Sequence, residues 1–129
     1  MSAQSNDQVY EQDSDGSSKK EWLCVMCKTQ HEHTAEDNLK RQGFTVYLPT
    51  APSKGRKQGR ATPDIKAMFP GYLFIEADLE HQDLSVIRST LGCIAFLRHG
   101  VRPALVPSQV MASIKEAEDV LHGRFEINQ

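Results

Sequence analysis

One stretch decides the fold of this 129-residue chain: Met68-Phe69-Pro70-Gly71-Tyr72-Leu73-Phe74-Ile75-Glu76-Ala77-Asp78. Its Pro-Gly pair predicts a turn, and the residues that follow predict a strand over Gly71–Ala77. Along this strand Leu73 and Ile75 alternate with aromatic residues, so both faces carry large side chains. Such strands are usually covered on both faces. Because a small domain has few elements to cover a second face, we expect one face to provide a docking site.

Outward from this strand, hydrophobic spacing predicts three more strands and three helices. The strands are expected at Glu21–Lys28, Phe44–Leu48 and Ile94–Leu97. The helices are expected at His31–Gln42, His81–Ser89 and Pro107–Leu121, with Gly123 just past the last helix. The polar segment Thr50–Pro63 predicts a long loop or an exposed hairpin. The order predicts an α+β fold, a ferredoxin-like βαββαβ sandwich with an added C-terminal helix.

Composition is ordinary for a globular protein, with 39% hydrophobic and 25% charged residues. Residues 1–20 are polar and acidic, and we expect a disordered tail there. A domain over residues 21–106, its C-terminal helix over 107–123 and a short tail over 124–129 complete the predicted organisation. No apolar run is long enough to span a bilayer, so no membrane association is expected. Three cysteines without a signal peptide favour a cytoplasmic location.

The sequence contains no recognisable catalytic motif, so we expect neither enzyme activity nor a small-molecule substrate. Cys24 and Cys27 have the spacing of a redox or zinc site, but residues three apart on a strand point to opposite faces. His31 and His33 would diverge on a helix in the same way. We therefore expect no metal site and no cofactor.

Polar side chains follow one side of the first predicted helix. They are Lys28, just before the helix, and His31, Thr34, Asn38, Arg41 and Gln42. Amide and guanidinium groups can bind base edges, and lysine binds phosphates. The pattern alone also fits a solvated helix face.

A group of bases lies in the polar segment: Lys54, Arg56, Lys57 and Arg60. Cations without neighbouring aromatic residues favour contact with a nucleic-acid backbone. A solvated hairpin tip fits the same composition.

The sequence has more large apolar residues than one side of a small sandwich needs for its core. They are Met26, Phe69, Tyr72, Phe74, Phe96, Met111 and Ile114. The pattern fits either a core or a flat docking surface for a helical partner.

Several motifs together resemble the N-terminal domain of the NusG family of transcription elongation factors. Trp22 opens the first strand, Gln42–Pro49 follows the first helix, and Phe96–Pro107 reads FLRHGVRPALVP. The last motif is closer to the specialised RfaH-like branch. The resemblance extends from about Glu21 to about Gly123.

The resemblance implies that the apolar set, with Pro70 and His99, binds the clamp helices of the largest catalytic RNA polymerase subunit. It also implies that the first helix contacts the non-template DNA strand. Lys28, Arg41, Gln42 and Thr90 match the RfaH-like pattern. Thr34, Asn38 and Leu91 depart from it, which leaves the recognised DNA sequence open.

A second polymerase contact is implied at the start of the second helix, where RfaH-like proteins carry a His-Thr-Thr motif. Asp83, Leu84 and Ser85 occupy those positions here. NusG relatives continue into a β-barrel domain of the KOW type, which this sequence lacks. The sequence fits either a naturally short protein or an isolated N-terminal half. Because this chain has nothing after Gln129 to act as a cover, we expect the apolar surface to remain uncovered.

These features predict an RfaH/NusG-like elongation and antitermination factor that binds RNA polymerase and suppresses pausing. The alternative is a stand-alone nucleic-acid-binding module of ferredoxin-like fold.

Overall fold

The computed structural model describes residues 20–57 and 59–127, without the side chains of 54–57, 60–63 and 125–127. Most of the predicted N-terminal tail and the last two residues of the chain therefore lie outside the described part. Among the described residues, no helix is both long and apolar enough to cross a membrane.

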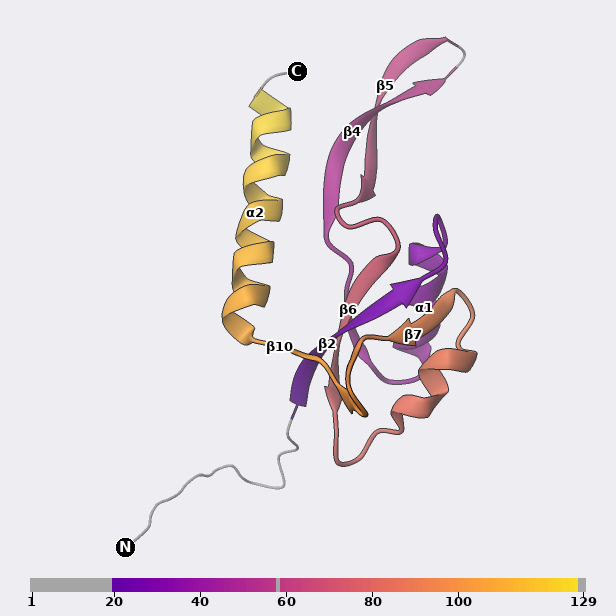
Figure 1. The fold of residues 1–129 in the computed structure, drawn as a ribbon. Coiled ribbons are helices and arrows are strands. Elements are labelled where there is room, and N and C mark those ends of the chain that lie inside the picture. The colour runs from indigo at the N-terminus through magenta and orange to yellow at the C-terminus, as the bar shows by residue number, and fades with distance from the viewer. Residues whose placement is uncertain (1–19, 58, 128–129) are drawn as a thin grey trace, which may run out of the picture.

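A five-stranded antiparallel sheet forms the centre of the molecule (Figure 1). Its strands are β2 (Lys20–Cys27), β3 (Thr45–Tyr47), β6 (Tyr72–Asp78), β7 (Cys93–Phe96) and β10 (Leu105–Val106). Strand β6 lies between β2 and β3, while β7 and β10 pair with the other edge of β2. The order β7-β2-β6-β3 is that of a split βαβ sandwich, so the predicted α+β, ferredoxin-like class is confirmed.

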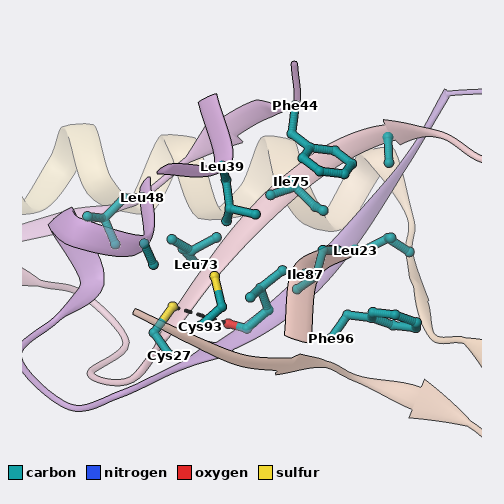
Figure 2. Packing of buried hydrophobic residues seen from close by; sticks show 13 residues of the cluster. Leu23, Cys27, Leu39, Phe44, Leu48, Leu73, Ile75, Ile87, Cys93 and Phe96 are labelled. Atoms are coloured by element: carbon teal, nitrogen blue, oxygen red, sulfur yellow. Dashed lines mark hydrogen bonds between the residues drawn. The ribbon is translucent and has the colours of Figure 1, made fainter. Parts of the chain in front are cut away.

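One face of the sheet carries the main core (Figure 2). Helix α1 (Glu32–Arg41) and the 3₁₀ helix η2 (Leu84–Ser89) supply side chains to it. Leu23, Leu39, Leu73, Ile75 and Ile87 are completely buried there. Each such side chain contributes about 1.5–3 kcal/mol of burial free energy, so this layer dominates the stability of the fold.

Helix α2 (Ser108–Ile127) lies on the opposite face of the sheet, alongside a long hairpin (Figure 1). The hairpin consists of β4 (Thr50–Lys57) and β5 (Arg60–Ala67). Of the two structures expected for Thr50–Pro63, the hairpin is the one that forms, and it extends further, to Ala67. A smaller hairpin, β8 (Arg98–His99) with β9 (Arg102–Pro103), precedes β10.

Much of the attachment of α2 to the sheet is polar. Lys115 Nζ lies 5.6 Å from the ring centroid of Trp22 and 5.3 Å from that of Tyr47. Glu118 accepts hydrogen bonds from the hydroxyl of Tyr47 at 2.6 Å and the backbone N–H of Thr50 at 2.7 Å. Among the apolar residues of the helix, Met111 is buried.

Two helix predictions need correction. The segment predicted as a helix over His81–Ser89 begins only at Leu84 and is a 3₁₀ helix, with Asp83 as its N-cap. Helix α2 continues through Gly123 to Ile127 instead of ending at Leu121. Glycine inside a helix costs only about 1 kcal/mol relative to alanine, so Gly123 is insufficient to end this helix.

Cys24 and Cys27 lie on opposite faces of β2, as strand geometry predicts. Cys24 is paired with Phe74 on β6, whereas Cys27 is buried beside Cys93 on β7. All three thiols are free.

Candidate functional site

The sheet face that α2 only partly covers carries an aromatic cluster, which we call the aromatic face: Phe69, Tyr72 and Phe74. The ring of Phe74 is buried, 6.2 Å from the ring of Phe69 in an edge-on arrangement and 6.4 Å from that of Tyr47. Phe69 and Tyr72 are 37% and 38% exposed, which is high for large aromatic residues next to a packed sheet. The buried ring of Phe74 therefore lies between those of Phe69 and Tyr47 at the base of the aromatic face.

A shallow apolar groove continues this face toward α2. It is lined by Met68, Phe69, Gln109, Val110, Ser113, Ile114 and Ala117. Val110 is 44% exposed and Ile114 is half-buried, whereas Met111 on the same helix is buried. Only part of the apolar surface of α2 is therefore covered, and the rest lines the groove.

The turn that presents Phe69 and Tyr72 is fixed by Glu32, a residue that the sequence analysis did not single out. Glu32 is only 7% exposed, and its Oε2 accepts a hydrogen bond from the N–H of Gly71 at 2.7 Å. The carbonyl of Gly71 in turn accepts from Cys27 N–H at 2.8 Å. Spacing could have revealed this residue, because Glu32 lies three and seven positions before the core residues Ala35 and Leu39.

The polar residues predicted to bind DNA lie on and around α1. Lys28, His31, Arg41 and Gln42 are exposed, whereas Thr34 and Asn38 are half-buried. Asn38 Nδ2 donates a hydrogen bond to the backbone oxygen of Thr34 at 2.7 Å. The amide nitrogen of Asn38 is thus used within the helix, and the side-chain oxygen is the group that can accept a hydrogen bond from a partner. The structure keeps these residues together on one flank of the helix.

Thr90 differs from this expectation because its side chain is only 5% exposed. Its hydroxyl donates to the backbone oxygen of Val86 at 2.8 Å and accepts from Nε2 of Gln42. The structure therefore gives the Thr90 hydroxyl two internal partners, and a DNA contact at Thr90 stays a prediction.

Three residues of the predicted polymerase-binding set are buried. Phe96 is 8% exposed and belongs to the main core, because β7 pairs Phe96 with Val25 on the core face. Phe74 is 7% exposed and packs beside Phe69, and Met111, on α2, is 3% exposed. All three side chains are buried in this structure, and their contact with polymerase stays a prediction.

The remaining predicted contacts are accessible to different degrees. Pro70 and His99 are exposed, while Met26 and Ile114 are half-buried. Asp83 and Ser85 are exposed but bonded to each other, since Asp83 Oδ1 accepts from the N–H and the hydroxyl of Ser85. Leu84 is partly buried against the core.

The basic residues of the long hairpin have a defined backbone only. Lys54, Arg56 and Lys57 lie in β4 and Arg60 lies in β5, but their side chains are outside what the structure describes.

Comparison with known proteins agrees with this architecture. The family model "Transcription termination factor nusG" matches residues 20–115. The transcription termination/antitermination protein NusG of Staphylococcus aureus strain Mu50 is 27% identical over 110 residues, covering 75% of this chain and 60% of the relative. The protein of strain N315 matches equally well.

Among solved structures, Thermotoga maritima NusG superposes with a TM-score of 0.55 at 22% identity, over 72% of this chain and 54% of that one. That similarity shows the fold. The chain thus spans somewhat more than half the length of these relatives. Since the family model covers most of the described residues, the chain belongs to the NusG family.

Proposed function

We propose that this protein binds RNA polymerase through the aromatic face and contacts DNA through the polar flank of α1, acting as an elongation and antitermination factor of the RfaH-like branch. The observation that carries the proposal is the exposure of Phe69 and Tyr72 beside an apolar groove, in a chain that matches the NusG family.

The shape of the aromatic face suits a helical partner. Two half-exposed rings stand next to the groove along α2, and a partner helix could place its apolar side chains between them. The clamp helices of the largest catalytic polymerase subunit are the proposed occupant. Rigid aromatic rings lose little conformational entropy on binding and commonly form the energetic centre of an interface.

The two proposed contacts are compatible with simultaneous binding. Helix α1 packs on one side of the sheet, the core face (Figure 1). The aromatic face lies on the other side, because Phe74 and Tyr72 alternate along β6 with the core residues Leu73 and Ile75. A polymerase bound at Phe69 and Tyr72 therefore leaves Lys28 and Arg41 free to bind the non-template strand. Binding that is stronger to a closed clamp than to an open one would favour the closed state and so reduce pausing.

The assignment to the RfaH-like branch rests on Lys28, Arg41 and Gln42, which match that branch and are exposed. Thr34 and Asn38 depart from it. We therefore propose the same mode of DNA contact with a different preferred sequence.

Binding of purified RNA polymerase to Phe69→Ala and Tyr72→Ala tests the docking face. Loss of an aromatic anchor near an interface centre costs about 2–4 kcal/mol of binding free energy. Leu91→Ala is the matched control, because Leu91 is 67% exposed but lies away from the aromatic face, in the turn before β7. Thermal unfolding of each variant shows whether the domain is intact.

Unchanged polymerase binding by both aromatic variants would refute the docking face. Tight binding to free nucleic acid at physiological salt, without any affinity for polymerase, would instead support a stand-alone nucleic-acid-binding module.

A further inference from the structure

Two of the three cysteines lie opposite each other at the end of β2. The β2–β7 ladder pairs Cys27 with Cys93, just past the irregularity that follows Met26. Both side chains are buried in the main core, at 4% and 5% exposure. Figure 2 shows their sulfur atoms directed into the same part of that core. Neither thiol takes part in the proposed docking or DNA contacts.

The backbone around the two cysteines has the geometry of a close, non-hydrogen-bonded pair. The N–H of Cys27 points away from β7 and donates to the carbonyl of Gly71, just before β6, at 2.8 Å. The strands are joined instead by the neighbouring residues, since the N–H of Lys28 donates to the carbonyl of Gly92 at 2.9 Å. In such pairs the Cα atoms are about 4.5 Å apart. A disulfide accepts Cα separations of about 4.4–6.8 Å, so Cys27 and Cys93 can be bridged without moving either strand.

Other roles for this pair of thiols fit less well. A structural metal needs more ligands, and no group of three metal-ligating side chains converges within residues 20–57 and 59–127. The thiol of Cys27 makes one weak contact, to the carbonyl of Val25 at 3.8 Å. This contact is too weak to hold the side chain in one rotamer, so the sulfur is free to turn toward Cys93.

We propose that Cys27 and Cys93 form a reversible disulfide by exchange with a low-molecular-weight disulfide such as oxidised glutathione. One protein thiolate attacks the oxidant, releases one glutathione and leaves a mixed disulfide. The second protein thiolate then displaces the second glutathione, and the S–S bond of the protein replaces that of the oxidant. The protein loses two electrons and two protons, and glutathione gains them as two thiols.

Local opening of β7 gives the oxidant access to these thiols. Strand β7 has four residues and pairs with β2 alone in the described part of the chain. Short edge elements open locally at a lower free-energy cost than global unfolding. Once one thiol has formed the mixed disulfide, reclosing of β7 brings the other against it. Cys24 cannot compete, because it lies on the opposite face of β2.

The disulfide locks the edge of the sheet that supports α1. Lys28 and Gly92 directly flank the two cysteines, and Gly92 lies against the backbone of Ala35 in α1. Residues 28–92 lie between the cysteines, so the crosslink closes a long loop and restricts the unfolded chain. Oxidation therefore stabilises the domain, and reduction releases β7.

The test is equilibration of the purified protein in glutathione buffers of graded ratio, followed by acid quenching, alkylation of the remaining thiols and peptide mass spectrometry. Samples start from reduced protein and from protein oxidised in denaturant and then refolded, so that slow exchange cannot conceal the equilibrium. We expect a linked peptide pair that joins Cys27 to Cys93. The effective concentration of the two thiols toward each other should be about a hundred- to a thousandfold higher in the folded than in the denatured protein.

Cys93→Ala and Cys24→Ala are the matched variants, since each removes one thiol. We expect oxidation to raise the thermal unfolding midpoint of the wild type and of Cys24→Ala by roughly 10 °C, and to leave that of Cys93→Ala unchanged. Circular dichroism of the reduced variants shows that they are folded.

Three results would overturn the proposal. They are a linked pair that includes Cys24 in the folded protein, no linked pair from either starting point, and equal effective concentrations in the folded and denatured protein. Each readout is independent of polymerase docking, which the variants at Phe69 and Tyr72 test separately.

Discussion

Gln42, at the end of α1, donates a hydrogen bond from its side-chain amide to the hydroxyl of Thr90, at the end of η2. The two residues are 48 positions apart in the sequence, and both belong to the set expected to bind DNA. The bond joins the flank of α1 to the loop before β7 and orients the amide of Gln42. Thr90 is thus a support for the polar flank of α1.

Replacement of Thr90 with valine tests this relationship. Valine preserves the shape but removes the hydroxyl, so we expect a loss of about 0.5–1.5 kcal/mol in the free energy of unfolding, measured in urea. Without the hydroxyl, the side-chain amide of Gln42 is no longer held in one orientation. We expect DNA recruitment to weaken only to the extent that this orientation matters for the contact. A variant that is as stable as the wild type but loses DNA recruitment would instead show a direct contact from the Thr90 hydroxyl.

DNA contact by α1 is tested with Lys28→Ala and Arg41→Ala in polymerase elongation complexes. Each should lower the salt slope of recruitment by about one unit while polymerase binding stays intact. Lys40→Ala is the matched control, since Lys40 is on the same helix but pairs with Glu36 at 3.1 Å, away from the polar flank. Equal recruitment of the wild type and both test variants at every salt concentration would mean that this flank is only solvated.

Gly92 holds α1 against the loop before β7, and its replacement should be costly. Its φ angle is +89°, and an added Cβ would lie 2.7 Å from the backbone nitrogen of Ala35, which cannot move without moving the helix. We expect Gly92→Ala to lower the free energy of unfolding by roughly 2–4 kcal/mol, from backbone strain and overpacking together.

Gly100→Ala is the control for this steric effect. Gly100 has a φ angle of +69° but no atom within 4 Å of the added Cβ, so only the backbone strain of about 1 kcal/mol should appear. Similar losses in the two variants would contradict the close contact between Gly92 and α1.

The attachment of α2 should depend on pH through Glu118. Desolvation alone would raise the pKa of this carboxyl, but the hydrogen bonds from Tyr47 and Thr50, with the electrostatic effect of His122, lower the pKa below its usual value. Because the pKa in the folded state is depressed, the stabilisation is complete above the unfolded value of about 4.3 and is lost as the pH falls through the folded value.

Tyr47→Phe removes one of these donors. We expect it to lower the free energy of unfolding by about 1 kcal/mol at neutral pH, less than a fully buried charged hydrogen bond because Glu118 is only partly buried. The difference from the wild type should shrink as the pH falls below about 4. A difference that is constant from neutral to acid pH would show that the charge of Glu118 is not involved.

The cysteines should react slowly with thiol reagents while the protein is folded. Burial, with smaller effects of Cys93 and Glu32, raises the pKa of Cys27 to about 12, and burial raises the pKa of Cys93 to about 11. Because the thiolate is the reactive form, both should resist modification near neutral pH. Cys24 is less buried and should react first, although its pKa is also raised to about 11.

Reaction in denaturant provides the reference, since all three thiols should then react at similar rates. Rapid modification of Cys27 in the folded protein would indicate that β7 opens readily from β2.

Much of the fold follows from the sequence because its signals are local. The alternation around Leu73 and Ile75 identifies β6, and the spacing of Ala35 and Leu39 with Gly43 identifies α1, each within a residue or two of the observed bounds. The exposed residues of α1 follow from the same period, since a helix that buries one side must turn the others outward.

Other features depended on tertiary structure. The sequence of β7 allows either face to point inward, and only the pairing of Phe96 with Val25, next to an irregularity in the β2–β7 ladder, directs that ring into the core. A shift of one residue in strand register reverses every side chain, and register is set by the partner strand. The short η2 likewise depends on packing against β7, since one or two helical turns are too few to be stable alone.

The sequence by itself therefore determined the class of the fold and the residues available to each surface. Which side chains remain accessible was decided only by the tertiary structure: Phe74 and Met111 are buried while Phe69 and Tyr72 stay half-exposed, and Glu32 is directed inward to hold Gly71. The physical reason is that local propensity acts over a few neighbouring residues, whereas burial is the result of contacts between segments far apart in the chain.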